Sequence, residues 1–180
     1  MVLVFITIFI IASNKSLANT QTDSLKHQLL SSEGIEKMKV LQKICRSYLF
    51  VSPDSCAKYV STTIKLAQEL NDIENEANAN KQIGYAYFRV GEYDNSLLYF
   101  ERAQKLFFDI EDYLGSAIIT NFIGAVYYQK SDYSKAISYF VNTEKSCDTL
   151  IHNDSIQSPH LEYCPHTSKV TRKHAQSIEW

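Results

Sequence analysis

Apolar residues recur at spacings of three and four through residues 33–150, a period that predicts amphipathic helices rather than strands. The last such stretch shows the pattern most clearly, with apolar residues at Ile118, Phe122, Ala125, Val126, Tyr127, Ala136, Ile137, Phe140 and Val141. A polar turn at 130–134 divides this stretch into two runs, and a turn at 90–94 divides the preceding one. The pattern therefore predicts pairs of helices joined by tight turns.

The predicted pair of helices repeats along the chain. Residues 83–100 read IGYAYFRVGEYDNSLLYF, and forty positions later residues 123–140 read IGAVYYQKSDYSKAISYF with no insertion. The identical positions are Ile83/Ile123, Gly84/Gly124, Tyr87/Tyr127, Tyr93/Tyr133, Tyr99/Tyr139 and Phe100/Phe140. Self-similarity at a fixed period of about 20–50 residues indicates a stack of identical supersecondary units.

An earlier hairpin is more diverged. Residues 55–70 align with the second helix of the next unit at the same offset of forty. Residues 32–50 supply its first helix at an offset of thirty-nine, which implies a turn one residue shorter. Ser52 is expected to cap the second helix, with Pro53 in its first turn, where Pro is tolerated. Three hairpins are about the minimum at which such a stack buries a continuous core.

The later turns also carry signals that end one helix and begin the next. Gly91 is expected to close its helix in the left-handed conformation, which Gly adopts at little cost. Asp94 and Ser134 are expected to cap the helices that follow. Each unit is therefore predicted to be a helix, a tight turn and an antiparallel helix.

The repeat positions resemble those of the tetratricopeptide repeat family. An apolar residue precedes a small one, a Tyr follows, a turn similar to Gly-x-Tyr comes next, and a small residue and an aromatic one mark the second helix. The matching residues are Ile83, Gly84, Tyr87, Gly91, Tyr93, Ser96 and Phe100, and then Ile123, Gly124, Tyr127, Tyr133, Ala136 and Phe140. The resemblance covers roughly residues 33–150. It implies an all-α fold, a right-handed stack of about three antiparallel helical hairpins.

The period departs from the family's usual thirty-four residues, so the helices are expected to be longer by about a turn. Similar long-period arrays occur in exported bacterial proteins and ahead of the signalling domains of sensor histidine kinases. The resemblance implies a non-catalytic protein–protein interaction module that binds a peptide or protein segment in a concave groove. The alternative is the truncated sensory input region of a signalling protein such as a sensor histidine kinase.

In the resemblance, the first helix of each hairpin lines the groove. The aligned groove residues are Lys39, Gln42, Arg46, Phe50, Asn78, Lys81, Tyr85, Phe88, Arg89, Asn121, Tyr128 and Gln129, with Leu49, Ile118 and Ala125 beside them. These positions hold four cations and no carboxylate, so the expected ligand is a segment with acidic and aromatic character. The alternative is that the Lys and Arg side chains are a solvated rim.

Two Cys occupy positions that are small in the other hairpins. Cys45 and Cys56 align with Gly84 and Ser96, which in the resemblance face each other across a hairpin. Two Cys at such positions could meet the geometry of a disulfide, which needs Cα atoms within about 7 Å of each other. An oxidising compartment would favour the bond. The alternative is a pair of reduced Cys that serve as small buried residues.

The N-terminus predicts a signal peptide over residues 1–18. Residues 2–12 are an unbroken run of apolar residues and Thr, and Ser16-Leu17-Ala18 supplies small residues for cleavage after Ala18. The run is shorter than the ~18 apolar residues of a spanning helix. We therefore expect an exported protein, periplasmic or extracellular, with no stable membrane span after cleavage. The alternatives are an uncleaved anchor or a misplaced start codon.

The repeat pattern ends near residue 155, so residues 19–32 are expected to be a linker and residues 33–155 the repeat domain. Residues 156–180 shift to Pro, His and basic residues and are expected to be an irregular tail or a truncated fourth repeat. The tail brings together His160, Cys164, His166 and His174. Their spacing matches no strong zinc pattern, so no metal site is expected.

Composition narrows the function further. The formal net charge of −2 gives no electrostatic case for nucleic acid binding. Catalysis needs a convergent constellation of groups in a pocket. Residues 33–150 contain no His and no Gly-rich phosphate loop, so neither an enzyme nor a cofactor is expected.

Overall fold

The computed structural model describes residues 22–49 and 52–152, and these residues form an all-α helical repeat solenoid. The helices are α2 (Gly34–Tyr48), α3 (Pro53–Glu69), α4 (Ile73–Arg89), α5 (Tyr93–Asp109), α6 (Tyr113–Gln129) and α7 (Tyr133–His152). Residues 22–30 are also helical, and no strand occurs among the described residues. The fold class predicted from the repeat is confirmed.

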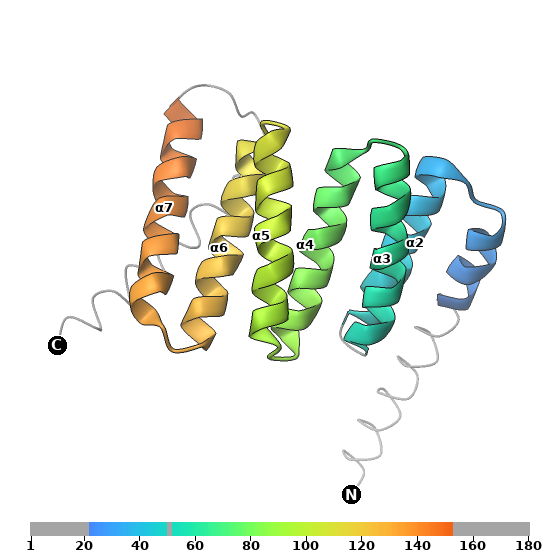
Figure 1. Cartoon of the computed structure of the whole chain (residues 1–180), viewed down its shortest axis with the longest axis horizontal. Helices are drawn as coiled ribbons and strands as arrows, with labels where there is room; N and C mark the ends of the chain where they lie inside the picture. Colours follow the sequence, from blue (N-terminus) through green and yellow to red (C-terminus); the bar gives the residue numbers. More distant parts are fainter. Residues whose placement is uncertain (1–21, 50–51, 153–180) are drawn as a thin grey trace, which may run out of the picture.

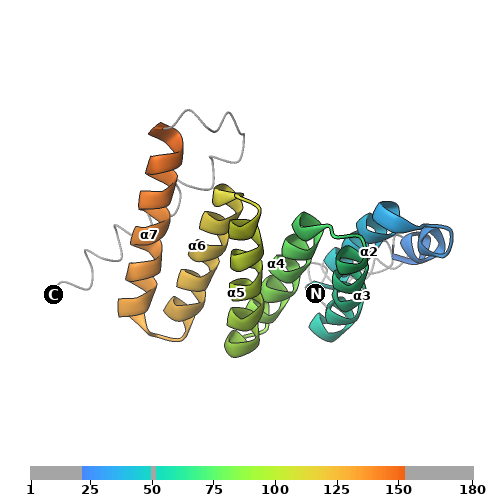
Figure 2. The same ribbon diagram turned by 45° about the horizontal axis from the view of Figure 1, so that its top comes forward.

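Successive helices lie side by side and run antiparallel along the array (Figures 1 and 2). Each helix packs against the next, and α2 also contacts α4, as α4 contacts α6. Among the described helices, α3, α5 and α7 make no such contact with one another. The first helices of the hairpins are therefore closer together than the second helices, which places α2, α4 and α6 on the inner side.

The forty-residue repeat consists of two equal halves. Helices α4, α5 and α6 are each 17 residues long and are joined by three-residue turns. The middle residue of each turn has a positive φ: 52° at Asn71, 82° at Gly91, 60° at Glu111 and 62° at Ser131. The next backbone N–H in each turn donates to a carbonyl five residues earlier, as from Glu92 to Tyr87. This hydrogen bond is that of a Schellman motif.

The turn geometry confirms the predicted role of Gly91 and corrects the predicted caps. The residue after the left-handed position is already the N-cap, so α5 and α7 begin at Tyr93 and Tyr133. Asp94 and Ser134 lie inside the first turn, where they cannot be the N-cap. The capping side chain before α7 is Asp132, which accepts from the N–H of Lys135.

Small and aromatic residues pack together inside the second and third hairpins. Phe100 is fully buried against Gly84, where an added Cβ would lie 2.7 Å from its Cδ1 atom. Gly124 meets Phe140 in the same way. Each hairpin also stacks two Tyr rings across its helices, and the centroid separations are 5.8 Å for Tyr48/Tyr59, 5.7 Å for Tyr87/Tyr99 and 5.4 Å for Tyr127/Tyr139. The first hairpin therefore shares the Tyr stack of its copies.

The first hairpin differs at its turn and at its N-terminal side. Helix α2 ends at Tyr48, and the Ser52 side chain caps α3 as predicted, accepting from the N–H of Ser55. Pro53 follows at the first helical position and holds Ser52 in an extended conformation. The helix at 22–30 lies within the segment 19–32 that was expected to be a linker. Its half-buried Leu25 and Leu29 are one helical turn apart, which explains why this segment is helical.

Candidate peptide-binding groove

The predicted groove residues come from the inner helices α2, α4 and α6. Their side chains differ in exposure. Lys39, Arg46, Arg89 and Gln129 are exposed, whereas Gln42, Asn78, Lys81, Tyr85, Phe88, Asn121 and Tyr128 are partly buried. Phe50 lies outside the described residues. The exposed positions hold three of the four predicted cations.

The fourth cation, Lys81, is engaged within the protein. Its Nζ donates a hydrogen bond of 2.7 Å to Asn78 Oδ1 and lies 5.3 Å from the centroid of the Phe107 ring. Burial lowers the pKa of Lys81 below its ordinary value, while the carboxylates of Asp112 and Glu74 oppose that shift. The structure thus makes Lys81 a half-buried ammonium that shields Phe107.

Aromatic rings form the centre of the inner side. The Tyr85 ring centroid lies 6.4 Å from that of Phe88 and 5.7 Å from that of Phe122 on the next inner helix. Phe122 in turn stacks on Phe100 at 5.3 Å. Tyr85 is therefore held in place by the second and third hairpins together, which makes it a rigid partly exposed aromatic side chain.

Polar contacts on the inner side include residues that the sequence reasoning did not identify. Gln42 Nε2 donates to Asn75 Oδ1 over 3.0 Å and so links α2 to α4. Asn121 Oδ1 is buried and has no hydrogen-bond partner among the described residues. Asn75 was missed because the family alignment covers the groove positions alone. Its place in the first turn of α4, opposite Gln42, depends on how the hairpins stack.

Cys45 and Cys56 lie together as the alignment predicted. Their sulfur atoms are bonded, the Cα atoms are 4.3 Å apart, and both residues are fully buried inside the first hairpin. Whether this pair is oxidised in the cell depends on the compartment, so the predicted disulfide remains a prediction for the native protein.

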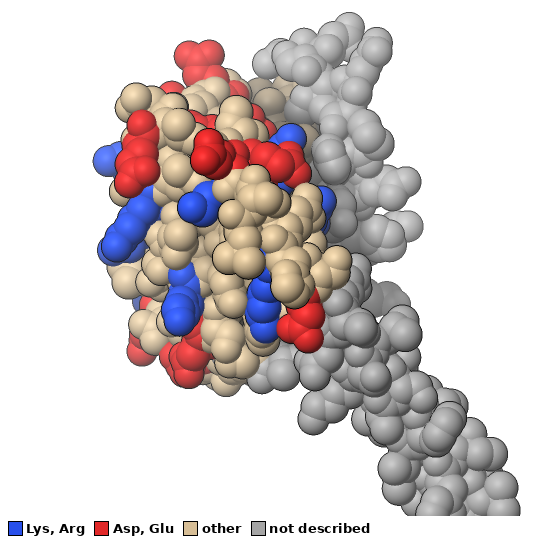
Figure 3. Space-filling view, turned by 90° about the vertical axis from the view of Figure 1, so that its right-hand side faces the viewer, with Lys and Arg blue, Asp and Glu red and all other residues tan. Residues whose placement is uncertain are grey.

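Charge is mixed on the surface next to the groove. On the end of the array nearest the N-terminal side (Figure 3), Lys and Arg side chains lie among Asp and Glu side chains. Neither sign forms a continuous patch on that face. One groove cation, Lys39, has a carboxylate neighbour in Glu36, 4.0 Å away. Lys39 is therefore not an isolated positive charge.

Some features predicted from the sequence lie beyond the described residues. The signal peptide and the tail residues His160, Cys164, His166 and His174 are among them. In the described parts of the chain, no three His, Cys, Asp or Glu side chains gather as a metal site would require. Within the same residues, no helix is both long and apolar enough to cross a membrane.

Comparisons with known proteins match this architecture. Residues 75–141, from α4 into α7, match the family model described as tetratricopeptide repeat. The crystal structure of BtubC (BKLC) from P. vanneervenii aligns with a TM-score of 0.55 and 13% identity, over 90% of this chain and 73% of that chain. At that identity the likeness shows the fold alone. No curated protein matches the chain. Residues 75–141 are thus assigned to the tetratricopeptide repeat, a helical repeat that is typically a non-catalytic scaffold and generally binds protein partners.

Proposed function

We propose that this protein is a non-catalytic interaction module that binds a peptide or protein segment along α2, α4 and α6. The observation that carries the proposal is the family match over residues 75–141. The stacking supports it, because the inner helices contact each other and bring their side chains to one surface. A surface built from neighbouring helices can hold an extended or helical segment along its length.

The ligand that this surface suits has acidic and aromatic side chains. The exposed cations Lys39, Arg46 and Arg89 offer charge-assisted hydrogen bonds to carboxylates. Tyr85, held between two hairpins, offers a preorganised aromatic contact. Asn121 adds a polar side chain whose Oδ1 is buried without a partner among the described residues.

Selection from a displayed library of random peptides would test the groove. We expect the selected peptides to be enriched in Asp, Glu and aromatic residues. The double variant Arg46→Glu/Arg89→Glu should bind these peptides at least about tenfold more weakly, since each lost charged contact is worth on the order of 1 kcal/mol or more. The matched control is Lys65→Glu/Lys105→Glu, which reverses two exposed charges on the outer helices. Equal affinities in both double variants would refute the electrostatic part of the proposal.

We also propose that the protein is exported and cleaved after Ala18. The support is the apolar run at 2–12 followed by small residues. N-terminal sequencing of the protein from its native source tests this directly. A mature chain that begins at Asn19 is the expected result, and an intact Met1 on cytoplasmic protein would reject it.

A second candidate is the sensory input region of a signalling protein. The forty-residue period favours it, because arrays of this period resemble those that precede kinase domains. Reading the gene beyond the codon for Trp180 separates the two candidates. Further repeats followed by a membrane span and a kinase-like domain would support the second.

A further inference from the structure

Exposed apolar side chains gather where one hairpin joins the next. The α3–α4 and α5–α6 turns lie on one edge of the array, at the top of Figure 1, while the α4–α5 and α6–α7 turns lie on the opposite edge. We call residues 66–77 and 106–117 the inter-hairpin edge. Its exposed apolar residues are Leu70 (45%), Ile73 (41%), Phe108 (61%) and Tyr113 (47%).

Phe108 and Tyr113 form an aromatic pair on this edge. Their ring centroids are 6.0 Å apart in an edge-on arrangement. Phe88 and Tyr93 occupy the corresponding positions of the α4–α5 turn and are half-buried there. The pair at the α5–α6 turn is thus more open to solvent than its counterpart, and exposed aromatic side chains are typical anchors of protein interfaces.

The charged residues within the inter-hairpin edge itself are all negative. Residues 66–77 and 106–117 contain seven carboxylates and no Lys or Arg. The fold accounts for four of the carboxylates. Asp72 and Asp112 cap the helices that follow them, and Glu74 and Glu76 lie in the first turn of α4, where the helix dipole favours negative charge.

The other three carboxylates, those of Glu69, Asp109 and Glu111, occupy positions that the fold disfavours. Glu69 and Asp109 are the last residues of α3 and α5, where the helix dipole opposes negative charge. Glu111 has a φ of 60°, which is costly for a residue with a Cβ. All three are exposed, and none takes part in the ion pairs found among the described residues.

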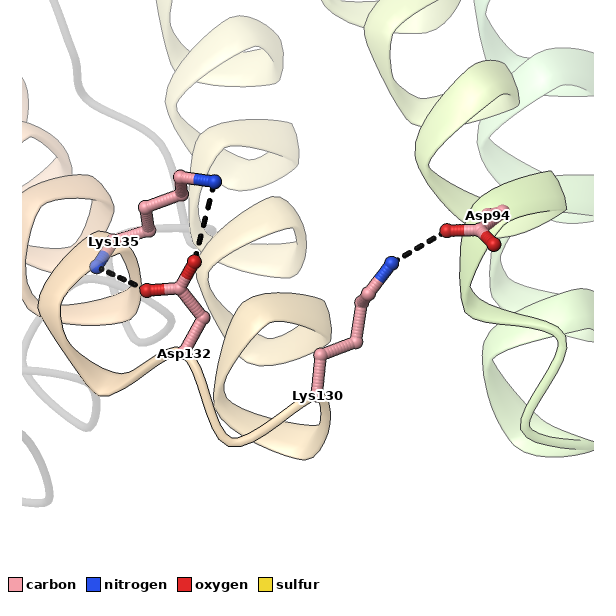
Figure 4. A network of polar contacts seen from close by, with 4 residues as sticks. All are labelled: Asp94, Lys130, Asp132 and Lys135. Atoms are coloured by element: carbon pink, nitrogen blue, oxygen red, sulfur yellow. Dashed lines mark hydrogen bonds and ion pairs between the residues drawn. The ribbon is translucent and has the colours of Figure 1, made fainter.

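The opposite edge shows that the same turns can carry balanced charge. There Lys130 at the α6–α7 turn pairs with Asp94 at the start of α5, and Lys135 pairs with Asp132 (Figure 4). The turn geometry is the same on both edges, so the difference is in the residues alone.

The inter-hairpin edge holds no cation within its own residues. The neighbouring cations are Lys65 and Lys105, one helical turn before Glu69 and Asp109, and Lys81, whose charge interacts with Asp112 and Glu74. Against seven carboxylates, these three cations leave the edge with a net negative charge.

We propose that the inter-hairpin edge is a second protein-binding surface, distinct from the groove, and that its partner is a basic segment. A Lys or Arg side chain of the partner would lie on the Phe108–Tyr113 pair, between the carboxylates of Asp109 and Glu111. A cation in that position would be stabilised both by the faces of the aromatic rings and by charge-assisted hydrogen bonds to the carboxylates. The apolar side chains of Leu70 and Ile73, beside Glu69, extend the surface to the preceding turn.

A titration followed by NMR would test the edge, using the full ¹⁵N-labelled protein and a blocked peptide of Arg and Leu. The matched probe is a blocked peptide of Glu and Leu. We expect the Arg peptide to shift amide signals of residues 69–74 and 108–114, and the Glu peptide to shift none of them. Shifts centred on the inner helices, or the absence of shifts with the Arg peptide, would overturn the proposal.

Two variants separate recognition from folding. Asp109→Asn/Glu111→Gly removes both carboxylates and two features that oppose folding, so it should raise the Tm while weakening binding of the Arg peptide at least about tenfold. The control variant Asp94→Asn on the opposite edge should leave that affinity unchanged. Undiminished binding by the double variant would contradict the proposal. Arg46→Glu/Arg89→Glu should not alter edge binding, so the groove and the edge can fail independently.

Discussion

At the scale of single residues, the sizes of two facing side chains are matched in each hairpin, one on its first helix and one on its second. In the second and third hairpins, Gly84 and Gly124 are matched with Phe100 and Phe140. The first hairpin has Cys45 and, at the position equivalent to Phe100, the smaller Val60. A larger residue on the first helix is therefore compensated by a smaller one on the second, as close packing of an interior requires.

This matching of sizes predicts the effect of Gly84→Ala. The new Cβ would lie 2.7 Å from Phe100 Cδ1, so the fully buried ring or the backbone would have to shift. We expect a loss of about 1–3 kcal/mol in the free energy of unfolding, measured by urea denaturation. The double variant Gly84→Ala/Phe100→Val should lose less stability than the two single variants lose in sum, because the smaller Val makes room for the new Cβ. Strict additivity would argue against a direct clash.

Lys81 predicts a dependence of stability on pH. Since burial lowers its pKa in the folded protein, the unfolded chain holds the proton more tightly, and stability rises as pH increases through the interval between the two pKa values. Lys81→Met removes the charge and keeps an apolar cover on Phe107. It should stabilise the protein at neutral pH, by an amount that shrinks toward the ordinary Lys pKa. Thermal unfolding from pH 7 to pH 10 would measure this, with the exposed Lys65→Met as control.

At the scale of elements, one turn geometry is used four times with four different residues. The left-handed position holds Asn71, Gly91, Glu111 or Ser131. Gly is the natural choice there, and Asn tolerates the conformation better than Glu or Ser. The turns therefore differ in strain although their hydrogen bonds are alike. The shared backbone hydrogen bonds, rather than a shared residue type, give the four turns the same backbone geometry.

Glu111→Gly should raise the free energy of unfolding by about 0.5–1 kcal/mol, because it relieves the left-handed conformation of a residue with a Cβ. Gly91→Ala should lower it by a similar amount, for the opposite reason. Chemical denaturation of both variants tests the pair. Loss of stability in Glu111→Gly would mean that the Glu111 side chain makes a favourable interaction that outweighs the strain.

The helices and their pairing could be predicted from the sequence, because the forty-residue period and the apolar spacing are both visible in it. The N-cap residues of α5 and α7 could not be predicted as reliably. Asp94 and Ser134 are ordinary capping residues, and only the left-handed backbone at residues 91 and 131 moves the helix start to Tyr93 and Tyr133. Groove positions followed from the family alignment, but the engagement of Lys81 with Phe107 depends on packing between hairpins.

At the scale of the whole molecule, the two interfaces between hairpins differ. Phe122 fills the second one by stacking on Phe100. Its equivalent in the first interface is Gln82, whose Oε1 is buried without a partner among the described residues, as is Asn80 Oδ1. Because the stability of a repeat array is approximately the sum of unit and interface terms, the first hairpin should be the more weakly docked.

The disulfide should therefore protect the first hairpin more than the rest. Closing a loop of this length contributes on the order of 3 kcal/mol, and both Cys lie inside that hairpin. In the variant Cys45→Ala/Cys56→Ala we expect faster hydrogen exchange in α2 and α3, with α5 and α6 little changed. Mass spectrometry of exchanged peptides measures this. Uniform acceleration along the array would show instead that the hairpins unfold as one unit.

The equality of the turns has a consequence for how this chain can be rearranged. From α3 to α6, a helix and its following turn occupy twenty residues, so a cut at residue 71, 91, 111 or 131 meets the same backbone on both sides. A second copy of residues 73–112 inserted after Asp112 would join without a new loop. Two helices are the smallest insertion that keeps α6 on the inner side of the array. A single inserted helix would move every later inner helix to the outer side and every later outer helix to the inner side.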